Sequence, residues 1–136
     1  MGQGADIEVV AGVLVENNRV LLAQRGPDDS LANLWEFPGG KVENGETYEE
    51  ALIREFWEEL ALRVAVGPFI CREQVVQGAR TLNLYNYLIR RIDGEPQNRV
   101  HQNWAWVEVA RLCDYAMPEA DQRVVEWLQT NVKSTE

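Results

Sequence analysis

The glutamates Glu55, Glu58 and Glu59 have the spacing and chemistry of a cation-binding face. On a helix, side chains three and four residues apart share one face, here a sector of roughly 100°. The other side of the helix carries the apolar stripe predicted to pack on a core: Leu52, Ile53, Phe56 and Leu60. Three carboxylates together suit a hard divalent cation such as Mg²⁺, which binds oxygen ligands and substrate phosphates.

A solvated acidic surface is the competing interpretation of these glutamates. Like charges at helical spacing cost only about 0.2–0.5 kcal/mol per pair, so such a surface is tolerated. The preceding segment 35–46, WEFPGGKVENGE, predicts an irregular loop with turns at Gly39, Gly40 and Gly45. Glycines also let backbone groups approach a site closely. A metal site explains the glycines and the carboxylates together, and we favour it for that reason.

The elements around this segment are predicted from apolar periodicity and turn residues. Thr47 and Glu50 have the spacing of a capping box, which starts the acidic helix and predicts that it runs to about Leu60. Strands are predicted over 7–15, 20–25, 62–76, 81–91 and 104–109, and Pro118 lies near the first turn of a final helix over 119–132. This order predicts an α+β sandwich, and 136 residues fit a single domain over 1–136.

The overall charge argues against a nucleic-acid polymer as partner. Lysine and arginine number 13 against 22 acidic residues, a net charge of −9, whereas nucleic-acid binding needs a basic face. A small phosphorylated ligand remains compatible, because a bound metal inverts the local field. Cys71 and Cys113 form no CxxC pair, and no signal peptide or membrane span is evident. We expect a cytoplasmic monomer or homodimer without membrane partners.

From Gly40 to Leu62 the sequence resembles the Nudix box, G-x5-E-x7-R-E-U-x-E-E-x-G-U, in which U is a bulky aliphatic residue. The matching positions are Gly40, Glu46, Arg54, Glu55, Phe56, Glu58, Glu59 and Leu62. Phe56 is aromatic where an aliphatic residue is usual, which changes packing. Ala61 replaces the family glycine, at about 1 kcal/mol of strain if the turn there is left-handed. The segments LLAQR, LWEFPGGKVENGE and MPEADQRVVEWL extend the resemblance to the MutT branch, especially its bacterial CTP pyrophosphohydrolases.

This resemblance implies a Nudix fold, an α/β/α sandwich with a mixed sheet between helices. It also implies Mg²⁺- or Mn²⁺-dependent hydrolysis of a nucleoside triphosphate to a monophosphate and pyrophosphate. The implied roles are metal ligation by Glu55, Glu58, Glu59 and the Gly39 carbonyl, orientation of helix and loop by Glu46 and Arg54, and phosphate contact by Arg25 and Lys41. Arg54 is expected to hold a carboxylate with its bidentate fork.

The general base is left open between Glu55 and Glu59. Some family members use a glutamate on a later loop, but the segment 98–106, NRVHQNWAW, contains no acidic residue. His101 or Gln102 is the candidate there, and an ordinary surface histidine is the simpler interpretation of His101.

Asp121 resembles the family position that reads the nucleobase edge. An ionised aspartate only accepts hydrogen bonds, which favours the N4 amino group of cytosine, whereas a protonated one also donates and leaves oxidised purines open. A helix-capping aspartate is the alternative. Phe37 and the backbone from Glu36 through Pro38 to Gly39 are expected to line the base pocket. Tyr85, Tyr87, Trp104 and Trp106 offer stacking surfaces, although aromatic residues at strand spacing are more often core.

These residues favour a nucleoside triphosphate pyrophosphohydrolase for CTP or dCTP. The alternatives are a sanitising 8-oxo-dGTP diphosphatase and a Nudix module that binds a nucleotide without cleaving it. The binding module is disfavoured, because it usually has a degraded box and every carboxylate is intact here. A purely structural domain is disfavoured by the box as a whole.

Overall fold

The structure, a computed structural model, describes residues 6–28, 32–97 and 103–132. Its strands are β1 (Asp6–Glu16), β2 (Arg19–Gln24), β3 (Trp35–Glu36), β4 (Gly39–Lys41), β5 (Arg63–Gln77), β6 (Arg80–Asp93) and β7 (Asn103–Glu108). The α-helices are α1 (Tyr48–Leu60) and α2 (Gln122–Asn131), and two short 3₁₀ helices, η1 (Val109–Asp114) and η2 (Glu119–Asp121), precede α2.

The strands form one mixed sheet in the order β3-β2-β1-β6-β5, with β4 paired to β1 and β7 paired to β2. Strand β1 runs parallel to β6, with Val10 opposite Tyr85, and antiparallel to β4, with Val10 opposite Gly40. The hairpin of β5 and β6 is antiparallel and carries register shifts near Phe69. Because β1 is central, it is buried over 10–14, as its β-branched sequence predicts.

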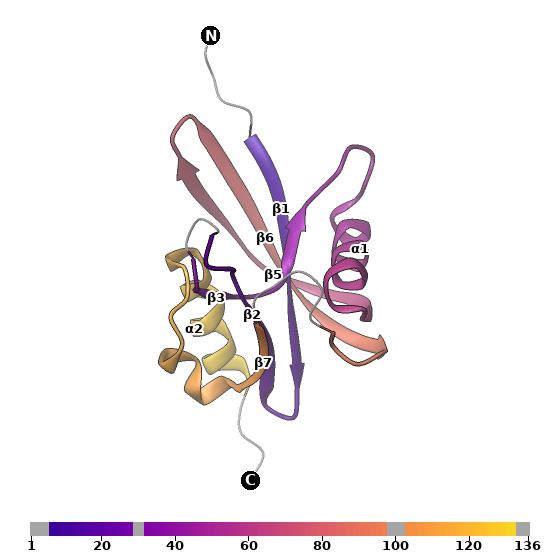
Figure 1. The fold of residues 1–136 in the computed structure, drawn as a ribbon, viewed down its shortest axis with the longest axis vertical. Coiled ribbons are helices and arrows are strands. Elements are labelled where there is room, and N and C mark those ends of the chain that lie inside the picture. Colours follow the sequence, from indigo (N-terminus) through magenta and orange to yellow (C-terminus); the bar gives the residue numbers. More distant parts are fainter. Residues whose placement is uncertain (1–5, 29–31, 98–102, 133–136) are drawn as a thin grey trace.

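The two α-helices lie on opposite sides of the sheet, with α1 on the right and α2 on the left of Figure 1. Each helix covers its own core cluster. Phe56, Leu52 and Leu60 of α1 pack with Leu14 and Ile89 on one side, whereas α2 packs with η1 and the inner strands on the other. The α/β/α sandwich with a mixed sheet is therefore confirmed.

The ends of α1 follow from local chemistry. Thr47 accepts a hydrogen bond from the Glu50 backbone, and the Glu50 side chain accepts one from the Thr47 backbone, which confirms the capping box. Ala61 ends the helix in the left-handed region, with φ 58° and ψ 33°. The left-handed turn that glycine makes in the family motif is thus retained, and adopting it with alanine costs about 1 kcal/mol of backbone strain.

Three predictions about local structure were wrong. Segment 35–46 is not wholly irregular, because β3 and β4 form there by pairing with β2 and β1. Ile53 is 44% exposed, so it does not belong to the core stripe of α1. The last helix begins as the 3₁₀ turn η2, and α2 itself starts only at Gln122.

Candidate active site

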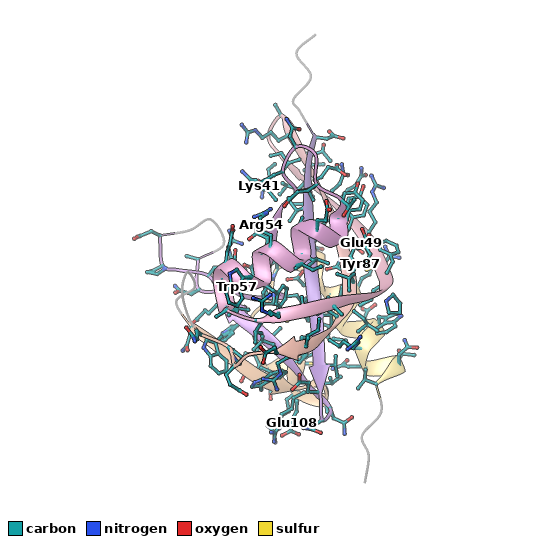
Figure 2. The ribbon with its side chains drawn as sticks, turned by 90° about the vertical axis from the view of Figure 1, so that its right-hand side faces the viewer. Lys41, Glu49, Arg54, Trp57, Tyr87 and Glu108 are labelled. Carbon is teal, nitrogen blue, oxygen red and sulfur yellow. The ribbon has the colours of Figure 1, made fainter. Side chains whose placement is uncertain are left out.

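Arg54 links the box residues into one network. Its Nε and Nη2 donate to the two carboxylate oxygens of Glu46 at 2.6 and 2.9 Å, the bidentate geometry of a guanidinium fork. Its Nη1 donates to Glu55 at 3.0 Å and to Glu58 at 3.2 Å, and its Nη2 also donates to the Lys41 carbonyl at 3.0 Å. The guanidinium lowers the pKa of Glu46 to about 2, so this carboxylate stays ionised. Figure 2 shows Arg54 beside Lys41, with Glu49 farther along α1 next to Tyr87.

Gly39 and Gly40 serve close approach rather than a turn, which corrects the prediction made for them. A Cβ at Gly39 would overlap the Val10 carbonyl of β1, and a Cβ at Gly40 would overlap the carboxylate of Glu55. Strand β4 therefore lies between β1 and α1 with no space for a side chain at either position. Of the three glycines, Gly45 is the one with a positive φ, 85°, and it makes the turn.

The carboxyls of Glu55 and Glu59 share a hydrogen bond on α1. Burial, followed by the hydrogen bond with Glu55 and the charges of Glu55, Glu36 and Glu58, raises the pKa of Glu59 to about 9. Glu55 is largely buried, with 13% of its side chain exposed, whereas Glu58 is 56% exposed. The three glutamates thus share a face, as predicted, but they differ in burial.

The donor chemistry of this face fits a divalent cation. Carboxylate oxygens are the ligands that Mg²⁺ prefers, and Gly40 leaves open the space in which the Glu55 carboxylate lies. As placed, no three acidic, histidine or cysteine side chains of the described residues converge on a common point. In this arrangement the carboxylates of Glu55 and Glu58 are each ion-paired with Arg54.

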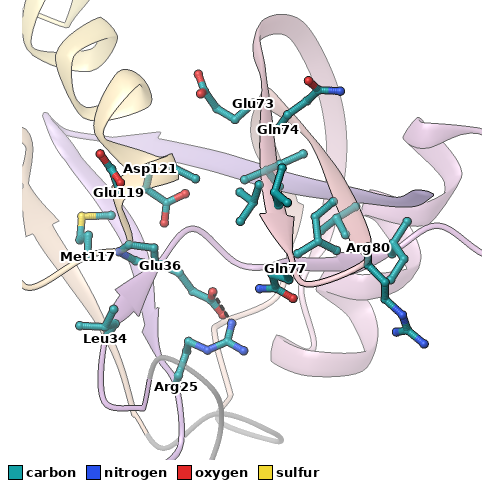
Figure 3. Close-up of a pocket in the computed structure, with 18 of the residues that line it drawn as sticks. Arg25, Leu34, Glu36, Glu73, Gln74, Gln77, Arg80, Met117, Glu119 and Asp121 are labelled. Carbon is teal, nitrogen blue, oxygen red and sulfur yellow. Dashed lines mark hydrogen bonds and ion pairs between the residues drawn. The ribbon is translucent and has the colours of Figure 1, made fainter. Parts of the chain in front are cut away.

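A cleft of about 1060 Å³ lies beside this network. Four of the predicted substrate-binding residues line it, namely Arg25, Glu36, Lys41 and Asp121, and so does Gly40. In Figure 3 the ion pair between Arg25 and Glu36, 2.8 Å long, lies on the opposite side of Asp121 from Glu73. Gly40 touches both the cleft and Glu55, so the carboxylate face of α1 adjoins the cleft at this residue.

Asp121 is buried, with 5% of its surface exposed, yet it lines the cleft. Its side chain makes no capping hydrogen bond to the described helix α2, so the capping interpretation does not explain it. Burial, followed by the negative charge of Glu36, raises its pKa to about 8. Of the two forms that the sequence left open, this shift in pKa favours the protonated one, which both donates and accepts hydrogen bonds.

Other predicted residues lie elsewhere. Phe37 is 3% exposed and packs in the core beneath α2, and neither it nor Pro38 lines the cleft. Tyr87 is buried in the core beneath α1, and the other three aromatic residues considered for stacking pack against that core: Tyr85, Trp104 and Trp106. His101 and Gln102 lie outside the described residues.

Sequence reasoning missed Glu73, which lines the cleft and forms a 2.9 Å ion pair with Arg123 of α2. The available signal was an acidic residue within a predicted strand, two positions after Cys71 and so on the same face. Its partner could not be inferred, because the two residues are fifty positions apart.

A mixed sheet between two helices, with the carboxylate-bearing helix α1 beside a cleft, makes the protein an α/β/α sandwich. Residues 6–128 match the family model described as NUDIX domain, so the chain belongs to the Nudix family and is a Nudix hydrolase. Members act on small nucleotide substrates and generally use a divalent metal such as Mg²⁺.

Individual relatives share much of the chain. It is 35% identical over 120 residues to CTP pyrophosphohydrolase of Escherichia coli K12, covering 88% of this chain and 89% of that one. It is 43% identical over 117 residues to the putative 8-oxo-dGTP diphosphatase 2 of Mycobacterium tuberculosis H37Rv, with coverages of 84% and 82%. The solution structure of the E. coli ORF135 protein superposes with a TM-score of 0.82 at 33% identity, covering 96% and 93%.

None of the described helices has the length and apolar character needed to cross a membrane.

Proposed function

We propose that this Nudix nucleotide pyrophosphohydrolase converts CTP and dCTP to the monophosphate and pyrophosphate. The observation that carries the nucleotide assignment is Asp121, a buried carboxyl that lines the cleft and whose pKa is raised by burial to about 8. A protonated carboxyl accepts one hydrogen bond and donates another. Cytosine offers an N4 amino donor next to the N3 acceptor, so it satisfies both oxygens of Asp121 at once. The relative named CTP pyrophosphohydrolase supports this assignment.

The carboxylates of Glu55, Glu58 and Glu59, with the Gly39 carbonyl, would hold the divalent cation. When bound, Mg²⁺ neutralises phosphate charge and makes water a better nucleophile. Arg54 orients Glu55 and Glu58 and connects them to the Glu46 loop. Arg25 and Lys41, both lining the cleft, bind the phosphates of the substrate. Glu55, or Glu59 once it has lost its own proton, takes the proton from water. The water oxygen attacks phosphorus, the anhydride bond between the α- and β-phosphates breaks, and pyrophosphate leaves.

The nucleotide assignment is tested by pyrophosphate release from CTP, dCTP, UTP, GTP and 8-oxo-dGTP, each with Mg²⁺. We expect the highest kcat/KM with CTP or dCTP. Asp121→Asn keeps a donor and an acceptor at every pH, so it should retain this preference near neutral pH. Asp121→Ala, which has neither, should lose it. Equal kcat/KM for all five nucleotides in the wild type would overturn the assignment.

A second candidate, 8-oxo-dGTP hydrolysis, is favoured by one feature of the same residue. The protonated Asp121 can also donate to O6 of a guanine-type base while accepting from its N1. The 43% identical M. tuberculosis relative carries a name of this kind. A large preference for 8-oxo-dGTP in the nucleotide panel would select this candidate.

The cation-binding role of α1 is tested with Glu59→Gln. This change preserves the shape but removes the carboxylate that Glu59 would offer once a cation displaces its proton, so we expect turnover to fall by orders of magnitude, at least about 10²-fold, with the fold intact. Glu49→Gln is the matched control, because Glu49 is exposed on the same helix and lies toward Tyr87. Wild-type turnover in Glu59→Gln would refute the role.

A further inference from the structure

Glu73 and Arg123 connect the two elements that hold the base-reading aspartate. Glu73 lies in β5, at the end of the sheet, and Arg123 lies in the first turn of α2, two residues after Asp121. Arg123 Nη1 donates to Glu73 Oε2 at 2.9 Å. The ion pair therefore fixes the start of α2, and Asp121 with it, against the hairpin of β5 and β6.

The two members of the pair differ in burial. The Glu73 side chain is 18% exposed and lines the cleft, whereas that of Arg123 is 65% exposed. Charges at an exposed position are screened by water, but charges near a buried group act through a lower dielectric. Glu73 therefore acts on Asp121 more strongly than Arg123 does, although the two charges are opposite and adjacent. Both Glu73 and Asp121 line the cleft, and in Figure 3 Glu73 lies above Asp121 with its carboxylate directed toward α2.

Several charged or titratable groups face Asp121 from the elements around it. These are Glu36 of β3, Arg25 after β2, Glu73 and Cys71 of β5, and Arg123 of α2 itself. Glu36 and Glu73 oppose ionisation of Asp121, and Arg25 favours it. Arg25 is bonded to Glu36, and burial and Glu36 are the larger causes of the raised pKa of Asp121, to which Glu73 adds a smaller effect in the same direction.

We propose that the Glu73–Arg123 ion pair is a positioning pair for nucleobase selection, which holds Asp121 in the cleft and maintains it in its donor-and-acceptor form. The proposal rests on the proposed function of Asp121. Neither residue needs to touch the base. Arg123 fixes the Glu73 carboxylate in place, and Glu73 adds its negative charge to the larger effects of burial and Glu36, which together favour the proton on Asp121.

The test compares pH profiles of KM and kcat for CTP between pH 6 and 9. Wild-type KM should rise as pH increases through about 8, where Asp121 loses its proton, and Asp121→Asn should flatten this rise. Glu73→Gln keeps the hydrogen bond to Arg123 but removes the charge. We expect it to move the rise in KM to lower pH, by on the order of half a pH unit. Glu119→Gln, at an exposed acidic position lining the same cleft, is the matched control and should leave the profile unchanged.

The double variant Glu73→Arg with Arg123→Glu, the exchanged pair, distinguishes an effect of the Glu73 charge on Asp121 from a purely structural link between β5 and α2. It restores an ion pair between β5 and α2 but places a positive charge beside Asp121. We expect thermal stability near that of the wild type and a rise in KM at still lower pH than in Glu73→Gln. A wild-type pH profile in the exchanged pair would reduce Glu73 and Arg123 to a structural clamp and overturn the proposal.

Failure of the proposed function gives a different result. If Asp121→Asn has the wild-type pH profile, then Asp121 does not read the base, and both proposals fail. If Asp121→Asn flattens the profile while Glu73→Gln and the exchanged pair leave it unchanged, only the role of the pair is overturned. Titration of the Asp121 carboxyl carbon by ¹³C NMR gives the same comparison without substrate.

Discussion

Substituting Gly40 by alanine adds one methyl group at the contact between β4 and α1. The new Cβ would overlap the Glu55 carboxylate, which lies at the end of a flexible side chain and can move. Gly40 has no positive φ, so alanine fits its backbone. Crowding of this kind costs about 1–3 kcal/mol, and the hydrogen bond from Arg54 Nη1 to Glu55 weakens as the carboxylate shifts. We expect a loss of about 2–3 kcal/mol, or roughly 10 °C in Tm, which leaves the protein folded.

Activity should fall much further than stability in Gly40→Ala. A displacement of a catalytic group by about 1 Å can reduce turnover by about 10²-fold, and Glu55 has to move by a distance of that order. The assays are a thermal melt and the kcat/KM for pyrophosphate release at saturating Mg²⁺. Isothermal titration with Mg²⁺ should show weaker binding than in the wild type.

Gly45→Ala is the matched control for this prediction. A Cβ at Gly45 meets nothing within 4 Å, but its φ of 85° strains alanine. It should therefore lose about 1 kcal/mol of stability and keep its kcat/KM. Gly39→Ala, whose Cβ would overlap backbone of β1, should fail to fold. If Gly40→Ala and Gly45→Ala have equal kcat/KM, the placement of Glu55 does not control turnover and the reasoning is refuted.

Three further predictions follow from single residues. Arg54→Lys keeps the charge but loses the bidentate hydrogen bond to Glu46. Denaturant unfolding should show a free energy of unfolding lower by about 1–3 kcal/mol, and kcat/KM should fall by about 10²-fold. Unchanged kinetics would contradict the orienting role of Arg54. Ala61→Gly removes left-handed strain and should raise the free energy of unfolding by about 0.5–1 kcal/mol, with a decrease as the contrary result. The pKa of Asp121 is raised in the folded state to about 8, whereas in the unfolded chain this carboxyl loses its proton near pH 4. Between these two pH values the free energy of unfolding of the wild type, relative to that of Asp121→Asn, should fall by up to about 1.4 kcal/mol per pH unit. Urea melts from pH 5 to 8 measure it, and a constant difference between the two proteins would contradict the prediction.

Local patterns in the sequence predicted much of the geometry around the candidate site. The capping box, the spacing of Glu55, Glu58 and Glu59 and the apolar residues of α1 depend on neighbours within one helix, so their consequences can be worked out residue by residue. The family motif extended this to Arg54 and Glu46, whose bidentate contact the structure contains.

Long-range packing accounts for what the sequence left open. Gly39 and Gly40 look like turn residues until β4 is placed between β1 and α1, where a side chain has no room. The protonated state of Asp121 depends on burial and on Glu36, which lies far away in the sequence, and the pairing of Glu73 with Arg123 joins residues fifty positions apart. Residue type and spacing determine which ionisable and polar side chains the protein has and which of them share a helix face. Their desolvation and the charges beside them arise only when distant segments fold against one another.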